Sequence, residues 1–169
     1  MRDRIKIRPA AREDIDAMAE LWTEFMDFHA ARDPWFKRSE SGHNSFAEFI
    51  RERIEDEKSI VLVAEADGKV VGHALAMITP RLPVFEPVEF AQIMDVAVAE
   101  THRRLGIGAK LVQEMMRIFR ERGIHRVEVG AANTNEVATA FWRKMGFTPY
   151  MQKSWLSIGV TDAGGCTTQ

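Results

Sequence analysis

Two glycines separated by one residue precede a long helical pattern in the second half of the chain. The stretch that contains them, residues 102–109, reads His-Arg-Arg-Leu-Gly-Ile-Gly-Ala. Glycine lets the main chain turn tightly and approach a ligand closely, because it has no Cβ. The free amides and the dipole of a helix N-terminus bind anions. The stretch therefore predicts a site for an anion such as a diphosphate, with Arg103 and Arg104 adding positive charge.

Other glycine motifs that bind nucleotides fit this stretch less well. It lacks the third glycine of a dinucleotide fingerprint, and it lacks the Gly-Lys-Ser/Thr ending of a P-loop. Neither NAD nor ATP is favoured as a ligand. Taken alone, the stretch is also compatible with a helix start whose glycines serve only packing.

The elements that position this turn have a mixed order along the chain. Apolar residues recur at helical spacing in some segments, and β-rich runs lie in others, two of them separated by the hairpin signal Asp67-Gly68. The expected elements are a strand at 5–8, helices at 12–30 and 46–54, strands at 59–66, 69–79 and 89–98, a helix at 108–122, a strand at 127–131, a helix at 135–145 and a strand at 150–158. This order predicts an α/β fold with a mixed sheet, without the repeated alternation of a doubly wound sheet.

The composition is that of one ordinary globular domain. The chain has 169 residues, of which 46% are hydrophobic and 28% are charged. We expect a single domain over residues 1–158 and a flexible C-terminal tail at 159–169. A formal net charge of −2 gives no basic field for binding phosphates, so nucleic acid is not an expected partner.

Cysteine and histidine usage gives no sign of a disulfide or a metal site. Cys166 is the only cysteine, so no internal disulfide forms, and the histidines lack metal-ligand spacing. No window approaches the roughly 20 apolar residues of a membrane span, and residues 1–30 lack the pattern of a signal peptide. We therefore expect a cytoplasmic protein that is not a membrane protein and binds no metal.

Two blocks of the sequence resemble the GNAT superfamily of acetyl-CoA-dependent N-acetyltransferases. The family hallmark Arg/Gln-x-x-Gly-x-Gly/Ala is met by residues 103–108. Residues 135–138 and 141–147 resemble the second block, Asn-x-x-Ala followed by aromatic-x-Lys-x-Gly-Phe. The resemblance covers nearly the whole chain, is specific between about residues 93 and 147, and is weak over the first 58 residues.

The resemblance implies where acetyl-CoA binds. Acetyl-CoA would lie in a V-shaped gap between the strand at 89–98 and the following parallel strand. Its pantetheine arm would pair with main-chain groups of the strand, and its pyrophosphate would bind the amides of the glycine turn. Asn135 would cap its helix and also reach the pantetheine, although capping alone is equally consistent. The implied cofactor-binding residues are Val96, Ala97, Val98, Arg103, Arg104, Leu105, Gly106, Ile107, Gly108, Ala109 and Asn135.

The reaction implied by the resemblance is direct attack of a neutral amine on the thioester. No enzyme nucleophile is required, and a main-chain N–H of the strand at 89–98 would stabilise the oxyanion. Relatives often carry a tyrosine that protonates the departing thiolate, but this chain has Trp142 at that position. Tyr150, the only tyrosine, is the candidate acid; water is the alternative.

The general base also departs from the family pattern. Gln92 and Met94 stand where relatives often have a catalytic glutamate. Asp95 is the nearest candidate base, although strict alternation along a strand would point it away from the face of Met94. Glu89, Glu24 and His29 are further candidates that would act through a water chain.

The acceptor amine would lie between the first two helices and the loops near them. This region is rich in acidic and aromatic side chains, and we expect Glu24, Phe28 and His29 to bind substrate. The pattern favours a cationic amine, such as a polyamine, an aminoglycoside or a peptide amine. The same aromatic residues also fit a core, and the acids a solvated helix face.

The function predicted from the sequence is acetyl transfer from acetyl-CoA to a primary amine. One alternative is a catalytically degenerate acyl-CoA-binding sensor or regulatory module, since the family tyrosine and glutamate are missing. A second alternative is an interaction domain that binds no CoA. Dimers are common in the family, so a homodimer also stays open.

Overall fold

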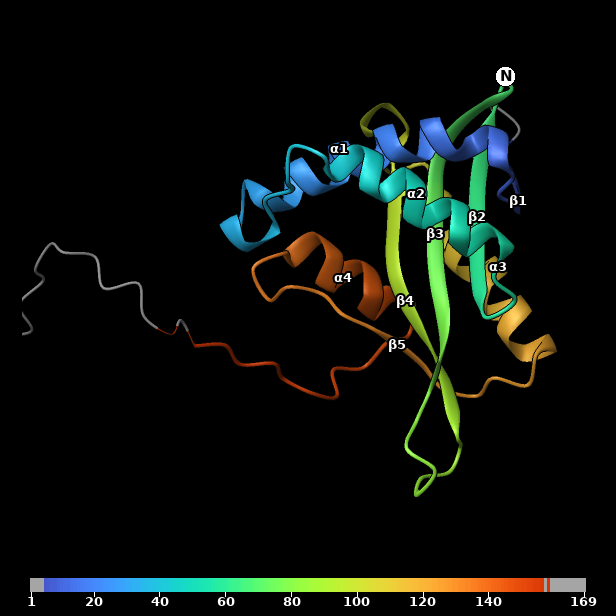
Figure 1. Ribbon diagram of the computed structural model, residues 1–169, viewed down its shortest axis with the longest axis vertical. Coiled ribbons are helices and arrows are strands. Elements are labelled where there is room, and N and C mark those ends of the chain that lie inside the picture. The colour runs from blue at the N-terminus through green and yellow to red at the C-terminus, as the bar shows by residue number, and fades with distance from the viewer. Residues whose placement is uncertain (1–4, 157, 159–169) are drawn as a thin grey trace, which may run out of the picture.

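A five-stranded mixed sheet forms the centre of the molecule in the computed structural model, which describes residues 5–156 and 158 (Figure 1). The strands are β1 (Lys6–Pro9), β2 (Ser59–Ala66), β3 (Lys69–Pro80), β4 (Glu89–Val98) and β5 (Val127–Val129). They lie in the order β1-β2-β3-β4-β5. Neighbouring strands are antiparallel except for β4 and β5, which are parallel. The expected mixed α/β fold is confirmed.

Helices cover both faces of this sheet. The helices are α1 (Ile15–Ala30), α2 (Gly42–Glu55), α3 (Ile107–Glu121) and α4 (Glu136–Lys144), with short 3-10 turns at Arg12–Asp14, Pro34–Phe36 and Glu100–His102. Helices α1 and α2 pack on one face, where they bury Met18, Phe46 and Ile50 against the sheet. Helix α3 packs on the other face (Figure 1). The sheet therefore has a hydrophobic layer on each side.

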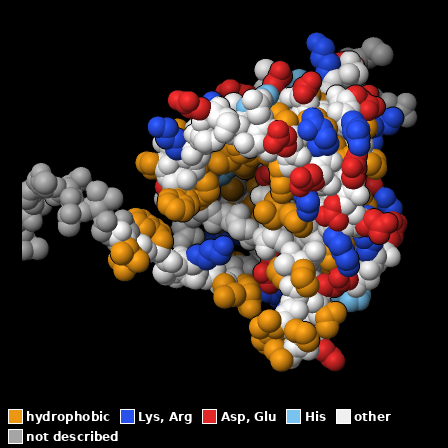
Figure 2. Space-filling view, viewed as in Figure 1, with side chains coloured by type: hydrophobic (Ala, Val, Ile, Leu, Met, Phe, Trp, Pro, Cys, Tyr) orange, Lys and Arg blue, Asp and Glu red, His pale blue; other side chains and the backbone are white. Residues whose placement is uncertain are grey.

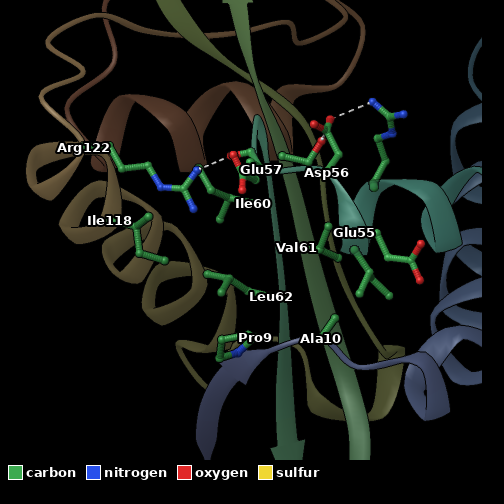
Figure 3. Close-up of a pocket in the computed structure, with 13 residues that line it drawn as sticks. Pro9, Ala10, Glu55, Asp56, Glu57, Ile60, Val61, Leu62, Ile118 and Arg122 are labelled. Atoms are coloured by element: carbon green, nitrogen blue, oxygen red, sulfur yellow. Dashed lines mark hydrogen bonds and ion pairs between the residues drawn. The ribbon is translucent and has the colours of Figure 1, made fainter.

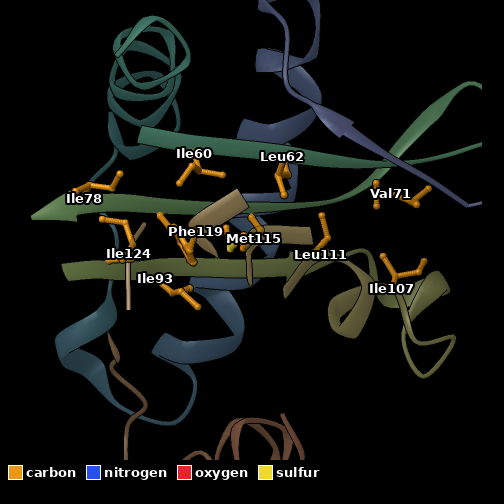
Figure 4. Packing of buried hydrophobic residues seen from close by; sticks show 14 of the residues in the cluster. Ile60, Leu62, Val71, Ile78, Ile93, Ile107, Leu111, Met115, Phe119 and Ile124 are labelled. Carbon is orange, nitrogen blue, oxygen red and sulfur yellow. The ribbon is translucent and has the colours of Figure 1, made fainter. Parts of the chain in front are cut away.

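The larger hydrophobic cluster lies between α3 and the sheet (Figure 4). Leu111, Met115 and Phe119 recur every four residues on α3, and all three are fully buried there. They meet alternate residues of β2, such as Ile60 and Leu62. Val61 and Val63, between them, pack under α1 and α2, so residues 60–64 of this strand are all apolar instead of alternating.

Several local signals in the sequence predict the structure correctly. Asp67 and Gly68 both have positive φ angles, of 49° and 76°, as the predicted tight hairpin between β2 and β3 requires. Helix α2, however, begins at Gly42, earlier than the expected start at residue 46, and β5 ends at Val129 instead of residue 131.

The predicted strand at 150–158 is wrong for the described residues of that segment, 150–156 and 158, which have no regular secondary structure. A strand needs a neighbouring edge to satisfy its main-chain groups. This segment instead leaves the sheet (Figure 1). Its large apolar side chains at Tyr150, Met151, Trp155 and Leu156 are exposed. Residues 159–169, expected to form a flexible tail and including Cys166, lie outside the described residues.

Neither a metal cluster nor a membrane span occurs in the described ranges. No group of three or more His, Cys, Asp or Glu side chains there is placed to hold a metal ion. Each described helix is too short or too polar to cross a bilayer.

A buried ion pair joins β1 to the start of α1. Arg8 Nη1 and Nη2 donate to the two carboxylate oxygens of Asp14, at 2.7 Å and 2.9 Å, and the Ala11 amide donates to Asp14 Oδ2 at 2.8 Å. Hydrogen bonding from Arg8 holds the pKa of Asp14 below its ordinary value of 3.8, against the opposing effect of burial. These contacts fix the direction in which the chain enters α1.

We expect Asp14→Ala to lower the free energy of unfolding by about 1–3 kcal/mol, because the partly buried Arg8 keeps only Glu65 as a carboxylate partner and the Ala11 amide loses its acceptor. Asp16→Ala, which removes an exposed carboxylate from the same helix start, is the matched control. Urea unfolding measures both. The pair contributes fully above the ordinary aspartate pKa of about 4, and its contribution is lost as pH falls through the lowered value of the folded state. An equal destabilisation at pH 7 and at pH 2 would contradict this assignment.

Candidate active site

A β-bulge in β4 decides which side chains of that strand face α1 and α2. Leu75 of β3 pairs with Asp95, whereas the next residue, Ala76, pairs with Ile93, so Met94 is an extra residue on β4. Before the bulge, Ile93 faces the α3 cluster; after it, Val96 does. Met94 and Asp95 consequently line the same hollow on the α1 and α2 side. The expected orientation of Asp95, away from Met94, is therefore wrong, because strict alternation does not hold across a bulge.

Asp95 is hydrogen-bonded to a buried histidine on the neighbouring strand. His73 Nε2 lies 2.9 Å from Asp95 Oδ1, and the His73 side chain is fully buried beside the ring of Phe46. His73 Nδ1 is buried without a hydrogen-bond partner. A proton on Nδ1 would be left unsatisfied there, so the neutral tautomer that carries its proton on Nε2 fits the site. His73 then donates to Asp95 and leaves Asp95 Oδ2 available to another group.

A hollow of about 630 Å³ lies in front of Asp95, between α1, the segment after it, α2 and the end of β5. Figure 2 shows this face hollowed, with hydrophobic side chains around the opening. Six aromatic side chains line it, together with Met26, Leu75 and Met94. The aromatic residues are Trp22, Phe25, Trp35, Phe36, Phe46 and Phe49. We call this hollow the aromatic pocket.

The parallel strands β4 and β5 separate beside this pocket. Their pairing joins residues 91–93 to residues 127–129 and extends no further in the described part of the chain. The pairing of β4 with β3, in contrast, continues to Val98. The main-chain groups of residues 94–98 on the β5 side are therefore unpaired with β5, although the Val98 carbonyl oxygen accepts from Arg103 Nε at 3.1 Å. Gly130 and Ala132 border the same opening.

The glycine turn, residues 103–108, follows β4 after the short 3-10 turn Glu100–His102. Gly106 has a φ of 79°, in the left-handed region, and it is the residue before the first turn of α3. Arg104 also has a positive φ, of 64°. Residues 103–106 are exposed, so their amides and the N-terminus of α3 are accessible to an anion.

Gly108 leaves space between α3 and α4. A Cβ built on Gly108 would lie 3.5 Å from the Phe141 ring and 3.9 Å from Val96, which are ordinary contact distances. Phe141 packs edge-on against Trp142, which in turn packs against Phe147 and the α3 cluster. Trp142 therefore occupies a packing position in this structure.

Asn135 caps α4. Its side-chain oxygen accepts a hydrogen bond from the Ala138 amide at 3.0 Å, and the residue is buried. The capping role expected from the sequence is confirmed. Contact of Asn135 with pantetheine stays a prediction.

Of the residues expected to bind substrate, only His29 lines the aromatic pocket. Its ring packs against Phe25, Phe28 and Phe36. Burial, with a smaller contribution from the charge of Arg32, lowers the pKa of His29 below its ordinary value of 6.5. His29 is therefore neutral at pH 7.

Glu24 and Phe28 contact arginines instead of the pocket. Glu24 Oε1 accepts from Arg103 Nη2 at 2.6 Å and from the Glu100 amide at 3.1 Å, which ties α1 to the glycine turn. Phe28 lies under the guanidinium groups of Arg32 and Arg103. Both residues lie beside the turn and outside the lining of the aromatic pocket.

Tyr150 lies apart from Asp95. It is exposed, and the guanidinium group of Arg126 lies 4.4 Å from the centre of its ring. Arg126 precedes β5 and its carbonyl oxygen accepts from the Ala91 amide, toward the opposite end of β4 from the glycine turn. The described structure thus brings together Asp95, His29 and the open edge of β4, but not Tyr150.

A second hollow, of about 270 Å³, lies between the end of α2, the start of β2 and the end of α3 (Figure 3). Both of its arginines have a partner: Arg53 Nη1 donates to Asp56 Oδ2 at 3.0 Å, and Arg122 Nη1 donates to the Glu57 carbonyl oxygen at 2.6 Å. None of the residues predicted to act in catalysis or binding lines this hollow in the described chain. We therefore place the candidate active site at the aromatic pocket and the adjoining edge of β4.

Sequence reasoning missed His73 and the bulge that turns Asp95 toward the pocket. A lone histidine within the otherwise apolar run of β3 was one signal. The other was the spacing of apolar residues on β4, where Ala91 and Ile93 are followed by Val96 and Val98, three positions later instead of two. Such a shift in spacing is what a bulge produces.

This fold, with an opened parallel strand pair beside a glycine turn, defines an acyltransferase class of protein. Residues 16–147 match the sequence model of the Acetyltransferase (GNAT) family. The chain belongs to the GNAT family. The predicted class, acyltransferase, is confirmed.

Individual relatives agree with this assignment. A probable N-acetyltransferase of Xenopus tropicalis, camello, is 31% identical over 121 residues, which are 67% of this chain and 53% of that protein. The chain thus spans about half the length of this curated relative. A solved tetramutant of the BH1408 protein from Bacillus halodurans is 25% identical, with a TM-score of 0.80, and the match covers 90% of this chain and 99% of that one. A predicted acetyltransferase from Clostridium acetobutylicum, solved with acetyl-CoA, has the same fold at 14% identity, with a TM-score of 0.73 over 92% of this chain and 96% of that one.

Proposed function

We propose that this chain transfers the acetyl group of acetyl-CoA to a primary amine. The observation that carries this proposal is the open edge of β4 between the glycine turn and the aromatic pocket. A ligand that follows this edge has an anion site at one end and a hollow at the other. Acetyl-CoA has the matching shape, since a diphosphate and an acetyl thioester stand at opposite ends of its pantetheine arm. The related fold solved with acetyl-CoA supports the same choice.

In this proposal the main chain does most of the cofactor binding. The amides of residues 104–109 hold the pyrophosphate at the N-terminus of α3. The pantetheine amides pair with Val96, Ala97 and Val98, as an added strand would. A main-chain N–H of β4 near the bulge then donates to the thioester oxygen, whose negative charge grows in the transition state.

Asp95 would act as the general base. It takes a proton from the ammonium form of the substrate through Oδ2, while the hydrogen bond from His73 holds its other oxygen. The neutral amine nitrogen then attacks the carbonyl carbon, and the bond between carbon and sulfur breaks. The nitrogen then loses its second proton to water, and water protonates the departing CoA thiolate, so the products are the amide and the CoA thiol. Asp95 returns its proton to the solvent before the next cycle. Proton donation by Tyr150 stays a prediction.

Thiol release and ligand binding together test this function. We expect acetyl-CoA to raise the melting temperature of the full chain, and a primary amine to release free CoA thiol from the complex. Binding of acetyl-CoA with no turnover on any amine would favour the sensor alternative. No rise in melting temperature would contradict both and favour an interaction domain.

A further inference from the structure

We propose that the acceptor is a primary amine with a single positive charge and an aromatic body, instead of a polyamine or an aminoglycoside. This inference rests on the proposed acetyl transfer and names the substrate class of the same site. It is carried by the lining of the aromatic pocket and by the pairing of the acidic side chains around it.

The walls of the pocket form an extended set of aromatic contacts. Trp22 and Phe46 are stacked, with ring centres 4.7 Å apart and planes 11° from parallel. On the other wall, the ring of His29 lies 4.4 Å from that of Phe25 and 5.4 Å from that of Phe36. Such walls stabilise a flat apolar group through burial and through edge-on or offset ring contacts. They offer few hydrogen bonds to a substrate rich in hydroxyl groups.

Three of the acids that suggested a cationic amine from the sequence are engaged elsewhere. Asp27 Oδ1 accepts from Arg38 Nε at 2.9 Å, and Glu24 binds Arg103. Asp33 Oδ1 accepts from the Trp35 amide at 3.0 Å. Asp95 is the only carboxylate among the described residues that line the pocket. The pocket therefore has one anionic partner for an ammonium group.

The remaining charges in the lining oppose a second ammonium group. Lys37 and Arg38 both line the pocket. His29 also lines the pocket, but its ring cannot supply a negative charge to an ammonium group. A second or third ammonium group would lose hydration without gaining a carboxylate, and it would be repelled by Lys37. The charges are thus complementary to a monocation.

A panel of amines tests this inference with the full chain. We expect kcat/KM for 2-phenylethylamine to exceed that for n-propylamine, which has the same charge, by at least about tenfold. We expect a similar margin over spermidine and over kanamycin. A second pair, phenylalanylglycinamide and glycylglycinamide, tests whether the aromatic amine belongs to a peptide. A preference for phenylalanylglycinamide would place the aromatic body at a peptide N-terminus.

Trp35→Ala tests the pocket itself. Trp35 lines the opening and is 87% exposed, so its removal leaves the core intact. We expect KM for 2-phenylethylamine to rise about fivefold, and KM for n-propylamine, which has no ring to contact Trp35, to rise by less. Trp155→Ala, which removes an equally exposed tryptophan outside the pocket, is the matched control and should change neither amine.

The outcomes separate this inference from the proposed function. Turnover with a preference for spermidine or kanamycin would overturn the substrate class and leave acetyl transfer standing. If no amine is acetylated, the proposed function fails. Binding of each amine, followed by quenching of tryptophan fluorescence with CoA present, then tests the ligand class on its own. Binding of 2-phenylethylamine at least tenfold tighter than that of spermidine would support an aromatic monocation as the ligand, and tighter binding of spermidine would overturn it.

Discussion

Replacing Asp95 by asparagine is expected to lower kcat/KM for amine acetylation by about 100- to 1000-fold while leaving the affinity for acetyl-CoA unchanged. The side-chain amide keeps the size of the carboxylate and can still accept the hydrogen bond from His73. It cannot take a proton from an ammonium group. Initial rates of thiol release across a pH series measure this effect. The deficit should shrink toward the pKa of the substrate amine, about 10 for an alkylamine, because the free amine then needs no base.

Glu89→Gln is the matched control for that experiment. It makes the same change from acid to amide on the same strand, but Glu89 binds Lys58 Nζ at 2.9 Å and does not line the aromatic pocket. We expect less than a twofold change in rate. If Glu89→Gln were as inactive as Asp95→Asn, or if both were active, the assignment of Asp95 as the base would be wrong.

The second large effect is expected from Gly108→Glu, which should weaken acetyl-CoA binding by at least about 100-fold. The new carboxylate would stand at the second residue of α3, among the amides proposed to hold the pyrophosphate, and repel it. The fold should tolerate the change. A Cβ at this position meets only ordinary contacts, and a negative charge at a helix N-terminus is favourable to the helix.

Calorimetric titration with acetyl-CoA measures this loss, and thermal unfolding without ligand shows that the variant is folded. Gln113→Glu adds the same charge to an exposed position on the same helix, beyond its first turn. Its affinity for acetyl-CoA should stay within about threefold of the parent. Tight binding by a folded Gly108→Glu protein would mean that the glycine turn does not hold the pyrophosphate.

Features that depend on neighbouring residues in the chain were predictable from the sequence. The hairpin at Asp67 and Gly68 and the turn at Gly106 each require positive φ angles, and glycine or aspartate at these positions reveals them. The cap at Asn135 is likewise a local signal. These local signals, together with the apolar spacing of the helices and strands, predict the order of the elements and place the glycine turn before α3.

Features that depend on contacts between distant residues were not predictable in the same way. Glu24 and Asp27 lie on one helix with no visible partner in the sequence, and only the fold brings Arg103 and Arg38 to them. The expected last strand failed for a related reason, since its apolar residues fit a strand but the short β5 provides no edge that they pair with in the described chain. The sequence pattern therefore could not show which acids near the first two helices have arginine partners.

The extra residue at Met94 also marks where the length of β4 can change during evolution. Ile93 and Val96 are held by the α3 cluster, and Asp95 must face the opposite side to reach the pocket. Deletion of Met94 would restore regular alternation and leave Asp95 opposite Leu75, with its carboxylate still on the pocket side. A deletion or insertion elsewhere within the strand would instead turn the side chains beyond it from one layer to the other. Relatives with a working site of this kind should therefore tolerate a change in the length of β4 at the bulge more readily than at other points of the strand.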